Sequence, residues 1–170
     1  MKNLVVYFSH EGQNSVDFNV QNINKGHTRI VAEKIALKLN ADLFRIVPKD
    51  PYPKDYDECV RRAKNEYENN ICPEIELPLP ESRNYNTVYL GFPIWFRTFP
   101  GVVSTFINGF DFENKTVKPF CTNEEGAFGI AEFELENLIK KQGGKTEHGL
   151  VVRGSQVNNC DEILDKWLKN

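Results

Sequence analysis

A run of five apolar residues near the start of the chain, Leu4 to Phe8, constrains the fold more than any other feature of the sequence. Its β-branched and aromatic side chains, with no polar residue between them, are typical of a strand that is covered on both faces. The pattern changes over residues 28–39, where apolar residues recur at helical spacing with charged residues between them. A second strand is expected at residues 43–47, before Pro48. This order of strand, helix and strand predicts an α/β fold.

The alternation continues to the end of the chain. Because crossovers between parallel strands are right-handed, the series predicts a doubly wound sheet of five parallel strands with helices on both faces. We find no repeat or linker, and 170 residues suit one core, so we expect a single domain over residues 1–170. The remaining strands are expected at residues 87–92, 116–121 and 149–153, and the remaining helices at residues 55–70, 100–109, 133–139 and 163–168.

Composition argues against several classes of function. The net charge is −3 and the lysines and arginines are scattered, so we expect no binding to nucleic acid. No apolar run approaches the roughly 20 residues that a membrane-spanning helix needs. The N-terminus lacks the pattern of a secretory signal, so we expect a cytoplasmic protein without a membrane partner. The four cysteines form no metal-ligand pair and are expected to be reduced thiols, with Cys121 a buried packing residue; no metal site is expected.

The loop from Ser9 to His27 leads from the first strand into a helix that begins near Thr28. Free backbone N–H groups and the helix dipole favour an anion at such a helix start, such as a phosphate. Ser9 and Thr28 offer hydroxyls, and Gly26 lets the backbone approach closely. The alternative is that Thr28 is only an N-cap and Gly26 only a turn residue. Neither a GxGxxG nor a GxxxxGK[ST] motif is present, which argues against a dinucleotide fold and an NTPase.

The segment after the third strand, residues 91–100, is unusually aromatic for a loop and reads Gly-Phe-Pro-Ile-Trp-Phe-Arg-Thr-Phe-Pro. Large aromatic residues at a strand end often mark a binding surface. A flat ring system could stack here while the backbone bonds its polar edge. The alternative is that Trp95 and Phe96 only cover the top of the core.

The loop after the fourth strand, residues 122–129, is mostly small and polar. Its backbone could bond the edge of a ring without crowding it. Glu124 and Glu125 could instead be charges of a solvated turn at a helix start, and we favour that role for Glu125.

Together these segments resemble the flavodoxin-like family, and more closely its bacterial flavodoxin-like oxidoreductases than its small acidic electron carriers. The resemblance spans nearly the whole chain. It rests on Val5-Val6-Tyr7-Phe8-Ser9, Gly26-His27-Thr28, Ala41-Asp42-Leu43-Phe44, Pro51-Tyr52-Pro53 with Asp55-Tyr56, Leu90-Gly91-Phe92-Pro93-Ile94-Trp95-Phe96, and Pro119-Phe120-Cys121-Thr122 with Phe128-Gly129.

The resemblance implies a flavodoxin-like sheet with strand order 2-1-3-4-5 and FMN as the cofactor. It also implies phosphate contacts from the first of these loops and flavin-ring contacts from the other two. The cofactor-binding residues expected on this basis are Ser9, His10, Gly26, His27, Thr28, Pro93, Ile94, Trp95, Phe96, Thr122, Asn123, Glu124 and Gly126.

Three features depart from the usual pattern of the family. Residues 10–25 form a long insertion, which some members share and which could act as a lid or contact a partner. His27 stands where Asn or Thr is more usual, so its protonation could affect phosphate binding. Glu124 and Glu125 stand where small residues are common, and a carboxylate near a reduced flavin would lower the reduction potential of the flavin.

The predicted function is that of an FMN-dependent oxidoreductase, which moves electrons or hydride from a small-molecule donor to a small acceptor such as a quinone. No side chain is predicted to be an essential acid or base, because the flavin carries the chemistry. His10 and Arg97 are candidates for substrate contact, and the alternative is that both are surface residues without a role. Two other functions stay open: an electron carrier between proteins, and a domain that has lost FMN and acts as a binding module. A homodimer also stays open.

Overall fold

The computed structural model describes residues 2–169 and contains the predicted parallel sheet. All strand pairs within this sheet are parallel. The predicted order 2-1-3-4-5 is confirmed. The strands lie in the order β4 (Asp42–Arg45), β1 (Lys2–Tyr7), β5 (Tyr85–Pro93) and β6 (Thr116–Asn123), followed by a position that β7 (Lys145–Thr146) and β8 (Leu150–Arg153) share.

The sheet has six strands rather than the five predicted, because its last position is divided. β7 pairs with Thr116 and Val117 of β6, whereas β8 pairs with residues 120–123. The interruption lies opposite Lys118 and Pro119, and proline has no N–H to contribute to a ladder. A two-residue strand such as β7 also carries too little periodicity to be recognised in the sequence.

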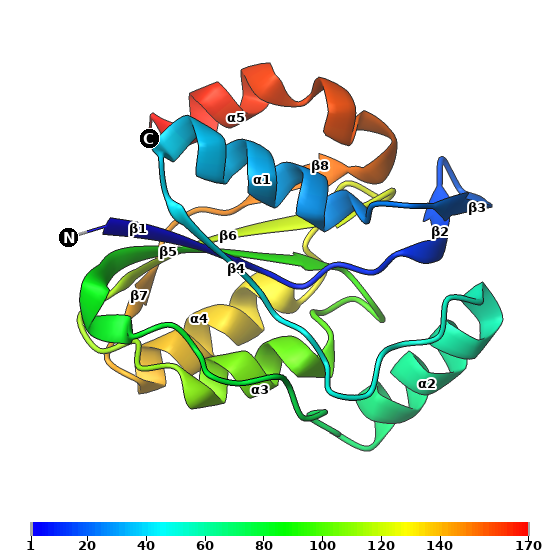
Figure 1. Cartoon of the computed structure of the whole chain (residues 1–170), viewed down its shortest axis with the longest axis horizontal. Helices are drawn as coiled ribbons and strands as arrows, with labels where there is room; N and C mark the ends of the chain where they lie inside the picture. Colours follow the sequence, from blue (N-terminus) through cyan, green and yellow to red (C-terminus); the bar gives the residue numbers. More distant parts are fainter. Residues whose placement is uncertain (1, 170) are drawn as a thin grey trace.

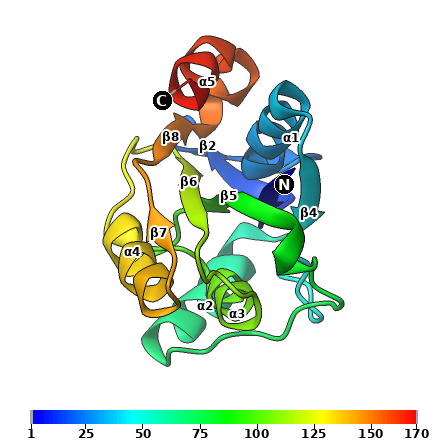
Figure 2. The same cartoon turned by 90° about the vertical axis from the view of Figure 1, so that its left-hand side faces the viewer.

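Four helices cover the two faces of the sheet, as expected for a doubly wound fold (Figure 1). On one face lie α1 (His27–Leu39) and α5 (Asp161–Leu168), and on the other lie α3 (Gly101–Gly109) and α4 (Ala131–Lys141). Figure 2 shows the same three layers from a second direction.

The side chains of β1 show why its sequence is continuously apolar. Successive residues of a strand point to opposite faces. Val5 and Tyr7 pack in the hydrophobic cluster on the side of α1 and α5, whereas Leu4 and Val6 pack in the cluster on the side of α3 and α4. All four side chains are buried, so each face of the strand needs apolar residues.

Helix α2 (Tyr56–Glu68) is an exception, because it extends beyond the carboxyl ends of the strands instead of covering a face (Figure 1). A small polar cluster anchors it to the segment before it. The Tyr52 hydroxyl donates to the buried Glu66 carboxylate at 2.6 Å. Arg62 donates to the same carboxylate at 2.8 Å and lies 4.2 Å above the centre of the Tyr52 ring. This cluster adds polar contacts to the packing of the buried Cys59 and Ala63 of the helix.

An antiparallel hairpin, β2 (Gly12–Val16) and β3 (Asn19–Ile23), occupies the insertion where the sequence predicts a loop. Its turn residues, Asp17 and Phe18, have φ of 50° and 60°. Positive φ at both positions is the pattern of a type I′ turn, whose twist suits a hairpin. An Asp-Phe pair lacks the Asn-Gly signal typical of such turns, so the hairpin is not evident from the sequence. Like α2, it lies at the carboxyl edge of the sheet (Figure 1).

Two 3₁₀ segments, Ser82–Asn84 and Gly154–Asn159, complete the regular structure of residues 2–169. None of the four cysteines forms a disulfide bond, and Cys121 is fully buried as predicted. No helix in the described part of the chain is both long and apolar enough to cross a membrane. Among the same residues, no group of three or more His, Cys, Asp or Glu side chains is arranged to hold a metal ion.

Candidate functional site

A cavity of about 440 Å³ opens at the carboxyl edge of the sheet, bordered by the loops after β1, β5 and β6, by the hairpin and by α2; we refer to it as the strand-edge pocket. All three loops that the sequence singles out reach it. Gly26 and Gly126 adjoin lining residues but are not part of the wall. The predicted residues that line it are Ser9, His10, His27, Thr28, Pro93, Ile94, Trp95, Phe96, Thr122, Asn123 and Glu124.

The start of α1 forms one end of the strand-edge pocket. The N-cap residue of this helix, Gly26, has no side chain to cap it, and the first turn contains no acidic residue. The backbone N–H groups of His27 and Thr28 belong to the first turn, which has no intrahelical acceptors for them, so they are free to bind an external anion. The N–H of Arg29 donates to Ser9 Oγ at 3.1 Å, which holds the Ser9 hydroxyl beside the helix start and leaves its proton to be donated.

The close approach of Gly26 to Ser9 and His10, and a hydrogen bond between two threonines, fix the geometry of this end of the pocket. A Cβ on Gly26 would lie 2.1 Å from Ser9 Oγ and 2.5 Å from the His10 carbonyl oxygen, so only glycine fits at this position. The hydroxyls of Thr28 and Thr122, both buried, bond each other at 2.7 Å. This bond joins the start of α1 to the end of β6, so the first and third loops are held together.

His27 and Glu124 lie side by side next to the helix start. A Cβ on Gly154 would be 2.3 Å from His27 Nδ1 and 2.5 Å from Glu124 Oε1. Burial lowers the pKa of His27 from its ordinary value of 6.5, and the nearby Glu124 carboxylate acts in the opposite direction. Glu124 is itself buried, and it accepts hydrogen bonds from the Ser155 N–H at 2.9 Å and from the Ser155 hydroxyl at 3.0 Å. Both of its oxygens are therefore engaged by Ser155.

Trp95 forms the aromatic side of the pocket. Its ring meets the rings of Tyr52 and Phe8 edge to face, with centroids 5.0 and 5.5 Å apart. The side chain is half-buried, packs against the main hydrophobic cluster and lines the pocket. Trp95 therefore covers the core and presents apolar surface to the cavity at the same time.

A tight turn from Trp95 to Thr98 reverses the chain within the loop after β5. Trp95 and Thr98 exchange two backbone hydrogen bonds of 2.8 and 3.1 Å, and the residues between them, Phe96 and Arg97, have φ of 50° and 67°. A left-handed backbone at a residue with a side chain costs about 1–2 kcal/mol, so surrounding contacts must stabilise the turn. One such contact is the stacking of the Phe96 ring on Tyr67 of α2, with centroids 5.8 Å apart and planes 18° from parallel.

The two candidate substrate contacts differ in exposure. His10 is buried, so the alternative that it is a surface residue is wrong. Its Nε2 lies 2.8 Å from the Pro53 carbonyl oxygen, and because a carbonyl only accepts, Nε2 donates there. The ring also meets Trp95 edge to face at 5.9 Å. Arg97 is exposed and is the only lysine or arginine among the residues that line the pocket.

The third loop is organised by the amide of Asn123. Its Oδ1 accepts from the N–H groups of Gly126 at 2.6 Å and Ala127 at 3.3 Å, and its Nδ2 donates to the Ala127 carbonyl at 2.7 Å. Gly126 has a φ of 75°, which glycine adopts without strain. Asn123 therefore shapes the loop. Glu125 is exposed, which suits the solvated role predicted for it.

The hairpin and α2 supply a part of the wall that is not expected from the sequence. Tyr56, Val60, Ala63 and Tyr67 form a stripe at helical spacing on α2, but such a stripe normally packs on a core. In the structure Val60 and Tyr67 of this stripe are exposed, because the helix borders cavities instead. The additional lining residues are Gln13, Asn14, Ser15, Phe18, Tyr56, Cys59, Val60 and Ala63.

The chemistry of the two ends of the strand-edge pocket fits a flavin mononucleotide. The helix start and the Ser9 hydroxyl offer donors to a phosphate, and Trp95 with Pro93 and Ile94 offers apolar surface to a flat ring. The volume of about 440 Å³ lies within the range of about 300–1,000 Å³ that is common for small-molecule pockets. A Cβ at Gly26 would displace the Ser9 hydroxyl from the helix start, so the donors at this end of the pocket depend on a glycine at position 26.

Comparisons with known proteins agree with this architecture. The family model for flavodoxin matches residues 2–170. A protein of Bacteroides uniformis described as a flavoprotein has a TM-score of 0.76 and 26% identity, and the match covers 99% of this chain and 98% of that one. A flavoprotein of Lactobacillus acidophilus, crystallised in complex with FMN, has a TM-score of 0.70 and 20% identity over 98% of both chains.

More distant relatives share the same fold. An NADH:FMN oxidoreductase in its apo form has a TM-score of 0.53 and 15% identity, and the match covers 100% of this chain and 86% of that one. A search of curated proteins found no match.

Proposed function

Because this chain belongs to the flavodoxin family, whose cofactor is FMN, we propose that it is an oxidoreductase that holds FMN in the strand-edge pocket and passes electrons from a reduced donor to a small acceptor such as a quinone. The similar L. acidophilus protein binds FMN, and a more distant relative is an NADH:FMN oxidoreductase, which supports this class of reaction. The cofactor supplies the redox chemistry. The chain supplies binding, orientation and exclusion of water.

In this proposal the phosphate lies at the start of α1. The N–H groups of His27 and Thr28 donate to its oxygens, and Ser9 donates its hydroxyl proton while its oxygen accepts from Arg29. Arg97 is the only lysine or arginine among the residues that line the pocket. Neutral donors and the helix dipole therefore carry most of the attraction for the phosphate.

The flavin ring lies against Trp95 in this proposal, with its polar edge toward the backbone of residues 122–126. Pro93 and Ile94 extend the apolar surface and exclude water from that side of the ring. His10 is positioned beside Trp95 with Nε2 committed to the Pro53 carbonyl, so only its Nδ1 can face a ligand. We assign no proton transfer to any side chain of the pocket.

One observation carries the proposal. The start of α1, where His27 and Thr28 lie, and the ring of Trp95, which are far apart in the sequence, line the same cavity. A cavity with anion-binding donors at one end and an aromatic side chain elsewhere in its wall suits a phosphorylated flat ring better than it suits either group alone.

The experiment is a titration of the purified, FMN-free protein with FMN, followed by absorbance and by flavin fluorescence. We expect binding of one FMN per chain with a dissociation constant of about 1 μM or lower. We also expect oxidation of NADH or NADPH with a quinone acceptor that depends on added FMN. Failure to take up FMN would reject the cofactor assignment. Uptake without turnover of small acceptors would favour an electron carrier between proteins.

A further inference from the structure

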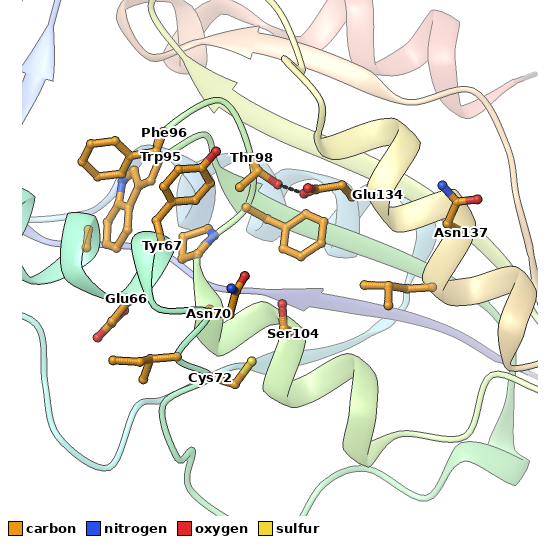
Figure 3. Close-up of a pocket in the computed structure, with 16 residues that line it drawn as sticks. Glu66, Tyr67, Asn70, Cys72, Trp95, Phe96, Thr98, Ser104, Glu134 and Asn137 are labelled. Atoms are coloured by element: carbon orange, nitrogen blue, oxygen red, sulfur yellow. Dashed lines mark hydrogen bonds between the residues drawn. The ribbon is translucent and has the colours of Figure 1, made fainter.

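Figure 3 shows the residues that line a second cavity, whose volume is about 360 Å³. We refer to it as the α2–α4 cavity, because its walls come from the end of α2, from residues 95–104 and from one face of α4. Ala63, Trp95 and Phe96 line both cavities, so the two share a wall. Its volume also falls within the range of about 300–1,000 Å³ that is common for small-molecule pockets.

Aromatic and aliphatic side chains form most of the surface of the α2–α4 cavity. Phe96 and Tyr67 stand next to each other with nearly parallel rings, and Tyr67 is 48% exposed (Figure 3). Phe99 and Leu138 add apolar surface from the loop and from α4. Flat apolar walls of this kind favour a planar aromatic molecule, because ring faces and edges contact one another over a large area.

One carboxylate gives this apolar cavity a directional polar contact. The Thr98 hydroxyl donates to Glu134 Oε2, as the dashed line in Figure 3 marks. Within residues 2–169 no side chain donates to the other oxygen of Glu134. The side chains of Asn70 and Ser104 also border the cavity in Figure 3, and neither makes a side-chain hydrogen bond to a described residue. An occupant could therefore donate to Glu134 Oε1 without displacing an existing partner.

The charges around the α2–α4 cavity select against anions. Its lining residues include neither lysine nor arginine. The second carboxylate in the wall, Glu66, is already bonded to Tyr52 and Arg62. Glu134 is thus the one lining carboxylate without a cationic partner. The phosphates of a nucleotide would meet no positive charge here, whereas a neutral or cationic molecule with an O–H or N–H group would be favoured.

We propose that the α2–α4 cavity is a second ligand site, which binds a small planar aromatic molecule that is neutral or cationic and donates an O–H or N–H to Glu134. The ring of this ligand packs among Tyr67, Phe96 and Phe99. The site is distinct from the strand-edge pocket and does not require FMN, although a ligand in it contacts Trp95 and Phe96 of the shared wall.

Three probes with the same naphthalene ring system test the proposal on the purified protein. 2-Naphthol carries a donor and no charge at pH 7, 2-methoxynaphthalene lacks the donor, and 2-naphthoate is an anion. We expect calorimetry to show 2-naphthol binding at least about tenfold more tightly than the other two, the value of one charge-assisted hydrogen bond. Equal binding of all three, or no saturable binding, would overturn the proposal.

Alkylation of Cys72 locates the bound probe. Cys72 is exposed and lines the α2–α4 cavity, whereas Cys59 and Cys121 are buried. Burial raises the pKa of the Cys59 thiol to about 11 and also raises the pKa of Cys121, so both react slowly. We expect 2-naphthol to slow the alkylation of Cys72 by iodoacetamide in proportion to occupancy. Full occupancy without any protection of Cys72 would place the probe elsewhere and contradict the assignment.

Two substitutions complete the test. Ser104→Phe fills the cavity from α3 and should abolish binding of 2-naphthol, whereas Asn108→Phe, an exposed position on the same helix, should leave it unchanged. Glu134→Gln should reduce the preference for 2-naphthol over 2-methoxynaphthalene, because a neutral amide oxygen accepts a weaker hydrogen bond than a carboxylate does. An unchanged preference in Glu134→Gln contradicts the role of the carboxylate, even if Ser104→Phe does not fold. FMN uptake, measured in each variant, reports separately on the strand-edge pocket.

Discussion

The two sides of the strand-edge pocket are built in different ways. The side at the start of α1 is formed by residues at the ends of the strands. Ser9 follows β1, Thr122 belongs to β6, and both are buried. The hairpin and α2 form the opposite side, extend beyond the sheet, and expose large side chains such as Phe18 at 70%. The core holds the first side in place, whereas α2 on the second side is held by the polar cluster around Glu66, by the buried Cys59 and by the stacking of Tyr67 on Phe96. We infer that the first side decides whether FMN binds and that the second side adjusts how tightly.

The largest effect is expected from Gly26→Ala, on the side that the core holds. The new Cβ would lie 2.1 Å from Ser9 Oγ, so the hydroxyl must leave its place beside the helix start. FMN affinity should fall by about 100-fold, which corresponds to about 3 kcal/mol. Fluorescence titration with FMN measures the change.

Gly109→Ala is the matched control for this substitution. Gly109 ends α3, and a Cβ there would meet only the tip of the Leu79 side chain at 3.0 Å. FMN affinity should stay within about twofold of the unmodified protein. If Gly26→Ala also bound FMN with unchanged affinity, the start of α1 could not be the phosphate site.

A smaller effect is expected from Tyr52→Phe, on the side that the hairpin and α2 form. The substitution removes the donor to the buried Glu66 and loosens the attachment of α2. The free energy of unfolding should fall by about 1–3 kcal/mol in urea denaturation. FMN affinity should fall by less than it does for Gly26→Ala.

Tyr67→Phe is the control for Tyr52→Phe. It makes the same chemical change on α2, but the Tyr67 hydroxyl has no hydrogen-bond partner among residues 2–169, and the stacking on Phe96 is kept. Its stability should stay within about 0.5 kcal/mol of the unmodified protein. A loss of stability equal to that of Tyr52→Phe would mean that the polar cluster does not anchor α2.

Phe18→Ser tests the tip of the hairpin. Phe18 lines the strand-edge pocket but is largely exposed, so it contributes only part of one wall. FMN affinity should fall by about threefold or less. Val20→Ser, at an exposed hairpin position outside the lining, should have no effect. An effect as large as that of Gly26→Ala would reverse the proposed ranking of the two sides.

The smallest effect concerns the pH dependence of the FMN-free protein. Burial lowers the pKa of His27 in the folded state below 6.5, so the unfolded chain binds a proton that the folded chain does not as the pH falls through 6.5. The free energy of unfolding should therefore decrease between pH 7 and pH 5. His27→Asn should make this decrease shallower. Thermal unfolding of both proteins between pH 7 and pH 5 measures the decrease. An identical pH dependence of stability in the two proteins would contradict its assignment to His27.

The sequence predicts the part of the molecule that the core determines. The continuous apolar run of residues 4–8 requires cover on both faces, which fixes the doubly wound sheet, and the strand ends then bring Thr28, Trp95 and Thr122 to one edge. The hairpin is not predictable, because its Asp17-Phe18 turn lacks the usual residues. The placement of α2 is not predictable either, because the apolar stripe of a helix beside a cavity resembles that of a helix on a core.

A crystal structure of this protein with FMN would test the central claim most directly, namely that the start of α1 and Trp95 serve one cofactor. We expect the phosphate oxygens within about 3.2 Å of Ser9 Oγ and the Thr28 N–H nitrogen, with the flavin ring in contact with Trp95. A phosphate bound away from α1, or a flavin ring that does not touch Trp95, would contradict the account.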